Sequence, residues 1–219
     1  MATRPPRALD VTKILTRGEL GAVLADLARK APRAPNTRVN LIVFRLAACC
    51  GLRASEIAQL QIDDVRVDHP RPHLRIRACA SKGGRPRIVP LWWDGGTLAD
   101  LTAWKQKRLD EGAGPQASYV CSLRPGRPDR PLSRHTLRKR FRTACKILGK
   151  DRLATLTIHH GRHTFLSHAL AGGRTLAEVR DAAGHWNITV TSGYLHAAVD
   201  DEQPVGTLFA YPHSTKSPT

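Results

Sequence analysis

Four separated segments of this sequence carry side chains suited to chemistry at a phosphodiester. The segments are Gly51-Leu52-Arg53-Ala54-Ser55-Glu56, Ser81-Lys82-Gly83-Gly84, His159-His160-Gly161-Arg162-His163-Thr164, and Gly184-His185 followed nine residues later by Tyr194. A phosphodiester is negatively charged, and the pentacovalent transition state of its cleavage adds charge on the non-bridging oxygens. Arginine stays protonated and its planar fork matches phosphate oxygens, so Arg53 and Arg162 are candidates to clamp them.

A phenol, an amine and two imidazoles could carry out the remaining steps. Attack by Tyr194 as a phenolate would form a covalent phosphotyrosine, which stores the energy of the broken bond. A free phenol has a pKa of about 10, so the attack needs a base or a cationic site. We expect His159 to accept the phenol proton and His185 to donate a hydrogen bond to the phosphate. Lys82, in a glycine turn, would protonate the departing 5′ oxygen.

Lys82, Tyr194 and the two arginines also have plain structural interpretations. Lys82 could be a solvent-exposed turn residue, Tyr194 could be a packed aromatic of the last helix, and either arginine could form a surface ion pair. Arg53 is poorly placed for such a pair, because it follows a buried helix and precedes Glu56. We expect Glu56, one helical turn after Arg53, to orient a catalytic group.

His159 and His163 are four positions apart, a spacing that also occurs in zinc-binding helices. The glutamate of that zinc motif is absent and no third ligand stands at a suitable distance, so we predict no metal site. His163 is instead expected to be a buried hydrogen-bonding residue that supports the site, and His160 and His196 to lie at the surface. The five cysteines form no CxxC pair, so we expect reduced thiols.

The charge balance points to a polyanionic partner. Lysine and arginine number 35 against 18 acidic residues, a net charge of +17 in 219 residues, and such an excess favours nucleic acid. An anionic membrane surface is the alternative, but no apolar run approaches the roughly 20 residues of a membrane-spanning helix. Residues 1–16 also lack the apolar stretch of a secretory signal. We therefore expect a cytoplasmic protein that binds double-stranded DNA.

The spacing of apolar residues predicts the elements that must position these side chains. Helices are predicted at 17–30, 37–50, 54–60, 98–109, 133–148, 160–171, 176–183 and 188–198. The helix at 37–50 is apolar nearly all round and should be the buried centre of the fold. Alternating residues at 73–80 and 85–91 flank Lys82-Gly83-Gly84 and predict a β-hairpin. One sizeable core, and therefore one active site, fits a chain of this length.

The helix predicted at 133–148 is strongly basic. Its apolar residues share one face, and the other faces carry five basic residues, Arg134, Arg138, Lys139, Arg142 and Lys146. Between Arg124 and Lys150 the only acidic residue is Asp129. A charge run is ordinarily a solvated helix face, but one of a single sign repels itself unless a polyanion neutralises it. We therefore predict that these five residues contact DNA.

Together the four segments resemble the tyrosine recombinase family of phage-type integrases. Its pattern is a GLR-x-SE turn, a lysine in a β-hairpin, an H-x-x-R-H-T segment and an LGH motif with the nucleophilic tyrosine nine residues on. The resemblance covers residues 16–199, in the family's order and at ordinary spacings. Ala183 stands where the family usually has leucine before Gly-His, and Gly161 where leucine usually precedes the second arginine. Both are packing positions.

The resemblance implies a fold, an activity and an assembly. The fold would be mainly α with a small antiparallel β-sheet (α+β), that of tyrosine recombinase catalytic domains and other DNA breaking-rejoining enzymes. The activity would be site-specific DNA recombination or integration through a 3′-phosphotyrosyl intermediate, without metal, nucleotide cofactor or small-molecule substrate. The catalytic residues would be Arg53, Lys82, His159, Arg162, His185 and Tyr194. Strand exchange would take place in a homotetramer on DNA.

Composition, which is rich in Pro, Arg and Thr without an apolar period over residues 1–16, and the resemblance together divide the chain. Residues 1–16 would form a flexible basic arm, 17–199 the catalytic domain, and 200–219 a tail whose apolar stretch at 205–211 could dock on a neighbouring protomer. Relatives usually carry a helical DNA-binding domain before the catalytic one. Because residues 1–16 have no room for such a domain, we expect either a naturally minimal recombinase or a fragment.

Two other functions remain open. A type IB topoisomerase shares this chemistry but relaxes supercoils as a monomer. The spacing from His185 to Tyr194 and the H-x-x-R-H-T segment favour a recombinase over it. A non-catalytic DNA-binding regulator that retains the fold is the other possibility, but no reactive position has been replaced.

Overall fold

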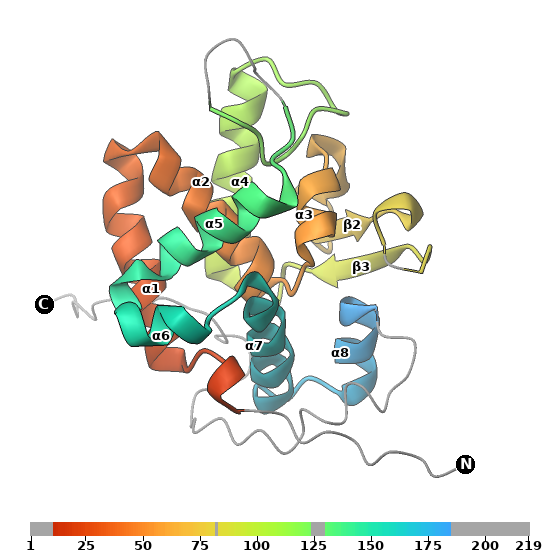
Figure 1. Ribbon diagram of the computed structural model, residues 1–219. Helices are drawn as coiled ribbons and strands as arrows, with labels where there is room; N and C mark the ends of the chain where they lie inside the picture. The colour runs from red at the N-terminus through yellow and green to blue at the C-terminus, as the bar shows by residue number, and fades with distance from the viewer. Residues whose placement is uncertain (1–10, 82, 124–129, 185–219) are drawn as a thin grey trace, which may run out of the picture.

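Helices make up most of the structure, and a small sheet lies at one side of them (Figure 1). The computed structural model of the chain describes residues 11–81, 83–123 and 130–184. The α-helices are α1 (Arg17–Lys30), α2 (Pro35–Phe44), α3 (Ala54–Gln59), α4 (Gly95–Asp110), α5 (Arg134–Ala144), α6 (Lys150–Thr155), α7 (Ile158–Ala171) and α8 (Leu176–Ala183). The strands β1 (Val65–Arg66), β2 (His73–Ile76) and β3 (Arg87–Pro90) form one antiparallel sheet in the order β1-β2-β3. The predicted class, mainly α with a small antiparallel sheet, is confirmed.

Side-chain caps and apolar spacing account for the helices that were predicted. At the start of α1, Glu19 N donates to Thr16 Oγ1 at 3.1 Å and Thr16 N donates to Glu19 Oε2 at 2.8 Å, which forms a capping box. The Ser133 side chain likewise accepts from a backbone N–H at the start of α5. The buried ring of Phe141 on α5 stacks on Phe44 of α2 with the ring centroids 5.6 Å apart. Helix α5 therefore packs its apolar face across the central segment and leaves its basic faces outside.

The segment predicted as one helix over 37–50 consists of two. Helix α2 ends at Phe44, and Arg45–Cys49 forms a π-helix whose wider turn closes with Cys50 N donating to Arg45 O at 3.0 Å. The wide turn carries the fully buried guanidinium of Arg45, which lies 3.2 Å from Asp94 Oδ2 and 2.7 Å from Asp100 Oδ2. Residues 39–50 are buried throughout, as predicted for the centre of the fold.

The chain enters the core before α1 begins. Val11–Lys13 forms a short 3-10 helix, and Leu15 is fully buried. The N–H of Leu15 donates to Thr164 Oγ1 at 2.9 Å, and the Leu15 carbonyl oxygen lies 2.8 Å from His168 Nε2. Residues 11–16 therefore belong to the folded domain rather than to the flexible arm expected over 1–16, because the apolar Leu15 packs beside α7. Residues 1–10 lie outside the described part of the chain.

The predicted β-hairpin is present, with shorter strands than the alternation suggested. Strands β2 and β3 pair from His73↔Pro90 to Ile76↔Arg87. The chain then leaves the sheet, and Ala78–Ala80 forms a 3-10 helix. At the departure point the Arg77 guanidinium donates to Asp64 Oδ2 at 3.0 Å and to the Gln59 carbonyl oxygen at 2.6 Å. These bonds hold the turn against the end of α3.

Two further differences concern helices. Helix α6 was not predicted, because it buries none of its side chains and so shows no apolar stripe. The helix predicted at 188–198 lies outside the described residues. In the part of the chain that the structure describes, no helix is both long and apolar enough to span a membrane.

Candidate active site

The first arginine of the site, Arg53, stands at the start of α3 and is held by Glu56. The Arg53 N–H donates to Glu56 Oε2 at 2.8 Å, and Arg53 Nη1 donates to Glu56 Oε1 at 3.0 Å. Glu56 is buried, whereas the Arg53 side chain remains 22% exposed. Arg53 thus pairs with a buried carboxylate rather than with a surface one, and its own side chain stays partly exposed.

A second guanidinium, that of Arg87 on β3, also holds Glu56. Arg87 Nη1 donates to Oε1 and Nη2 to Oε2, both at 2.8 Å. Burial raises the pKa of Glu56, but the hydrogen bonds and charge of Arg87, the Arg53 N–H and the charge of Arg162 together lower this pKa below its ordinary value. The carboxylate is therefore ionised at neutral pH and can hold both arginines.

Sequence reasoning missed Arg87, which lies outside the four motifs. The available signal was strand alternation, since Arg87 shares its side of β3 with the buried residues Val89 and Leu91. A basic residue on the buried side of a strand requires an acidic or carbonyl partner in the interior. Identifying Glu56 as that partner would have required the fold.

Arg162 on α7 is buried and joins two remote parts of the site. Its Nη1 donates to the Gly51 carbonyl oxygen at 2.7 Å, and its Nη2 donates to the Ala183 carbonyl oxygen at the end of α8. Gly51, two residues before Arg53, has a positive φ of 66°, and a Cβ there would lie 2.4 Å from Phe165 Cδ1. Only glycine fits that turn, so the glycine of the first motif has a packing reason.

His159 lies at the start of α7, exposed, in a strongly positive environment. Partial burial of its ring, together with the positive charges of Arg138, Arg53 and Arg162, lowers the pKa of His159 below its ordinary value. The neutral imidazole is the form that accepts a proton, which suits the predicted general base. Arg138, predicted to contact DNA from α5, therefore lies near enough for its charge to act on this histidine.

The two neighbouring histidines differ in their surroundings. His163 is half-buried, and burial, followed by the charges of His160, Arg162, His159 and Lys13, lowers its pKa to about 4. His160, expected at the surface, is instead only 9% exposed. That expectation was wrong because the His160 side of α7 packs inward, where His160 Nδ1 accepts a hydrogen bond from Thr157 N at 3.3 Å.

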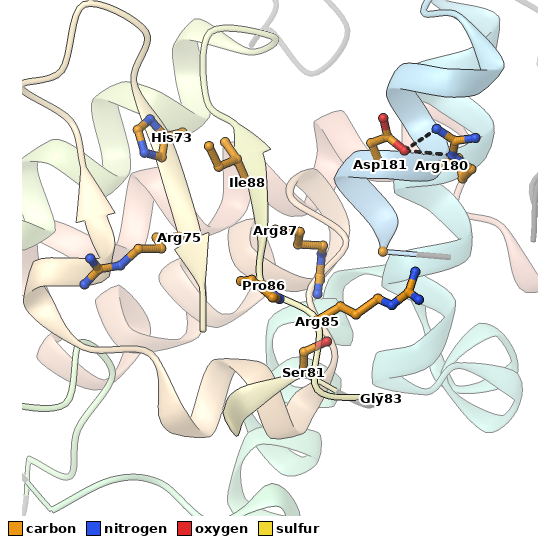
Figure 2. A pocket seen from close by; sticks show the side chains of 11 residues that line it. His73, Arg75, Ser81, Gly83, Arg85, Pro86, Arg87, Ile88, Arg180 and Asp181 are labelled. Atoms are coloured by element: carbon orange, nitrogen blue, oxygen red, sulfur yellow. Dashed lines mark hydrogen bonds and ion pairs between the residues drawn. The ribbon is translucent and has the colours of Figure 1, made fainter. Parts of the chain in front are cut away.

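Three predicted catalytic residues, Lys82, His185 and Tyr194, lie outside the described residues. The described neighbours Ser81, Gly83 and Gly184 line one cavity of about 820 Å³ between the hairpin and α8. Figure 2 shows Arg87 on the hairpin side of this cavity and the Arg180–Asp181 pair on α8. Of the predicted site residues that the structure describes, Arg53 and Glu56 are in contact, and the charges of Arg53 and Arg162 both act on His159.

The five basic residues predicted to contact DNA are all exposed. They are Arg134, Arg138, Lys139 and Arg142 on α5 and Lys146 in the 3-10 turn that follows. Arg142 Nη1 donates to the Leu156 carbonyl oxygen at 3.2 Å. Among the described residues none of the five is paired with an acidic side chain, so their charges are available to a polyanion.

The acidic, imidazole and sulfur-containing side chains of the described residues offer no metal cluster. No group of three or more His, Cys, Asp or Glu residues lies close enough together within residues 11–81, 83–123 and 130–184 to hold an ion. The five cysteines are free thiols, with Cys79 exposed and the others buried.

Comparison with known proteins identifies relatives over most of the chain. The model of the phage integrase family matches residues 15–200. Tyrosine recombinase XerC of Corynebacterium efficiens is 29% identical over 195 residues, which are 89% of this chain and 57% of that protein. Tyrosine recombinase XerD of Mycobacterium tuberculosis is 29% identical over 197 residues, 88% of this chain and 60% of that protein. The chain thus spans less than two thirds of the length of these relatives.

Solved structures share the fold. The XerA recombinase structure superposes with a TM-score of 0.67 at 20% identity and covers 89% of this chain and 61% of that one. The XerH site-specific recombinase bound to difH substrate superposes with a TM-score of 0.65 at 20% identity and covers 84% of this chain and 50% of that one. The fold implied by the four motifs is therefore confirmed.

Proposed function

Because the chain belongs to the phage integrase family, we propose that it is a site-specific tyrosine recombinase that cleaves and rejoins DNA through a 3′-phosphotyrosine. The observation that carries the proposal is the convergence of Arg53 and Arg162 on one turn. They come from helices far apart in sequence, and Arg162 bonds the Gly51 carbonyl oxygen across 111 positions. In the proposed complex each of these guanidiniums neutralises the charge on one non-bridging oxygen of the scissile phosphate.

The proposed reaction balances with side chains of this chain alone. His159 takes the phenol proton of Tyr194, whose oxygen attacks phosphorus. The bond from phosphorus to the 5′ oxygen breaks, and Lys82 gives that oxygen a proton. Arg53 and Arg162 neutralise the charge that grows on the non-bridging oxygens, and His185 donates a further hydrogen bond. The 5′ hydroxyl of another strand then attacks the phosphotyrosine and gives its proton to Lys82, while the bond from phosphorus to the Tyr194 oxygen breaks and His159 returns the proton to the phenolate.

The proposal includes double-stranded DNA as the partner and a homotetramer as the assembly for exchange. In support, basic residues of α5 are exposed, and the charge of Arg138 reaches His159. The solved XerH relative is bound to a DNA substrate. Glu56 would hold Arg53, and His163 would support α7 beneath the site.

The test is covalent capture on DNA. A nicked duplex library of random sequence is incubated with the protein, and adducts that survive denaturation are isolated, sequenced and mapped by peptide analysis. We expect the adduct at Tyr194, loss of the adduct in Tyr194→Phe, and retention in Tyr211→Phe. An adduct on another residue, or no adduct above the Tyr194→Phe background, would contradict the proposal. Rapid relaxation of plasmids without a preferred site would instead indicate a topoisomerase.

A further inference from the structure

We propose that Arg87 is a positioning residue of the recombinase: it keeps the charge of Arg53 available to the phosphate and fixes the chain that leads to His185. The inference rests on the proposed function and adds a residue that the four motifs do not contain. Three observations carry it: the shared carboxylate of Glu56, the carbonyl at the end of α8, and the close contact at Gly184.

The first observation concerns the charge around Glu56. Arg53 and Arg87 bond the same two carboxylate oxygens: Arg53 through its guanidinium Nη1 at 3.0 Å and its backbone N–H at 2.8 Å, and Arg87 through Nη1 and Nη2 at 2.8 Å each. Two guanidiniums thus bond one carboxylate, and these three groups together carry one excess positive charge, before the nearby charge of Arg162 is counted. Without Arg87, Arg53 would be the nearest cation to a buried carboxylate, and the pair would be neutral. Arg87 therefore lets Arg53 remain a net cation toward the phosphate.

The second observation concerns the end of α8. Arg87 Nε donates to the Ala182 carbonyl oxygen at 2.9 Å, and Arg162 Nη2 donates to the next carbonyl, that of Ala183. The last carbonyls of a helix lack partners within the helix and carry its partial negative charge. Two guanidiniums from different elements thus hold consecutive carbonyls directly before Gly184-His185.

The third observation is a close contact that only glycine permits. Gly184 caps α8 in the left-handed conformation, with φ 65°. A Cβ on Gly184 would lie 2.7 Å from Cδ of Arg87. The aliphatic part of the Arg87 side chain therefore occupies the space beside Gly184, the residue that precedes His185. The guanidinium of the same side chain bonds Glu56, which holds Arg53. Figure 2 shows Arg87 between the hairpin and α8.

Arg87 acts through other residues rather than on the substrate. Its side chain is 6% exposed, and all three of its guanidinium nitrogens donate to Glu56 or Ala182. The alternative is that Arg87 serves only stability, as a buried ion pair. A control for that alternative is Arg108 on α4, which is also 6% exposed and pairs at 3.1 Å with Glu111, a carboxylate 41% exposed.

The experiment compares Arg87→Gln and Arg87→Lys with Arg108→Gln in single-turnover cleavage. The substrate is the duplex recovered by covalent capture, prepared with the normal scissile phosphate and with a neutral methylphosphonate there. On the phosphate we expect Arg87→Gln to lose about 10²-fold in cleavage rate at saturating DNA, with DNA affinity unchanged. On the methylphosphonate the loss should shrink, because the charge that Arg53 neutralises is gone. The cleavage rate of Arg87→Lys should lie between those of the wild type and Arg87→Gln, because lysine lacks the planar fork of arginine.

Each outcome decides the inference. Equal rate losses in Arg87→Gln and Arg108→Gln, or the same Arg87→Gln loss on both substrates, would make Arg87 merely structural and overturn it. If Arg87→Gln does not fold by circular dichroism, Arg87→Lys carries the comparison, and unfolding of both would also assign Arg87 to stability alone. A wild-type protein that forms no adduct would instead refute the proposed function itself.

Discussion

Gly161 lies so close to Ala47 that a Cβ at position 161 would stand 3.0 Å from the backbone carbonyl carbon and oxygen of Ala47. Helix α7 therefore packs with little space against the π-helix Arg45–Cys49. This contact immediately precedes Arg162. The absence of a side chain at Gly161 thus sets how near the second arginine of the site comes to the Gly51 turn.

We predict that Gly161→Ala destabilises the protein by about 1 to 3 kcal/mol, because the added methyl group meets backbone that cannot yield easily. Gly21→Ala on α1 is the matched control, since a Cβ there has no atom within 4 Å. The free energy of unfolding of Gly21→Ala should rise by about 0.5 to 1 kcal/mol, because alanine has the higher helix propensity. Urea unfolding measures both. Equal stability of the two variants would show that the contact at Ala47 is not tight.

Replacing Arg45 by methionine should lower the free energy of unfolding by about 3 to 5 kcal/mol, because Asp94 and Asp100 then lose the cation that pairs with them in the interior. Asp94 is the more deeply buried of the two acids, with 4% of its side chain exposed against 25% for Asp100. The double variant Arg45→Met with Asp94→Asn should therefore lose less than Arg45→Met alone. Urea unfolding of the set tests this, and a double variant less stable than the single one would contradict it.

Stability should fall as the pH falls from 6.5 toward 4, because the pKa of His163 drops from 6.5 to about 4 on folding. In this window the unfolded chain binds a proton at His163 and the folded chain does not, so protons favour unfolding; above pH 6.5 the effect is absent. His163→Gln should make the unfolding free energy less dependent on pH across the window, and the lowered pKa values of His159 and His168 account for the dependence that remains. A slope in His163→Gln equal to that of the wild type would contradict this prediction.

DNA affinity should depend steeply on salt through α5. Replacing Arg138 or Lys139 by glutamine should reduce the slope of log affinity against log salt by about 0.9 for each phosphate that the variant no longer neutralises. Lys107→Gln on α4, a lysine paired with Glu111, should leave the slope unchanged. Fluorescence anisotropy of a labelled duplex at several sodium chloride concentrations measures these slopes. An unchanged slope in both α5 variants would place the DNA elsewhere.

Local periodicity was enough to predict the helices that bury an apolar stripe. It failed where contacts with residues far away in the sequence determine the backbone conformation. The π-turn at Arg45 depends on Asp94 and Asp100, 49 and 55 positions away. Helix α6 buries no side chain and so offered no stripe to read.

The site could likewise be predicted only where the signal is local in the sequence. Arg53, His159 and Arg162 stand in compact motifs, and the structure places them together. Arg87 has no motif, and its partners Glu56 and Ala182 are 31 and 95 positions away. Such a partner set is known only once the fold is known.

The attachment of Leu15 to α7 has a consequence for local opening. Both backbone groups of Leu15 bond side chains of α7, at Thr164 and His168. Its amide should therefore exchange with deuterium as slowly as those of the helix that carries His159 and Arg162, and far more slowly than a frayed chain end.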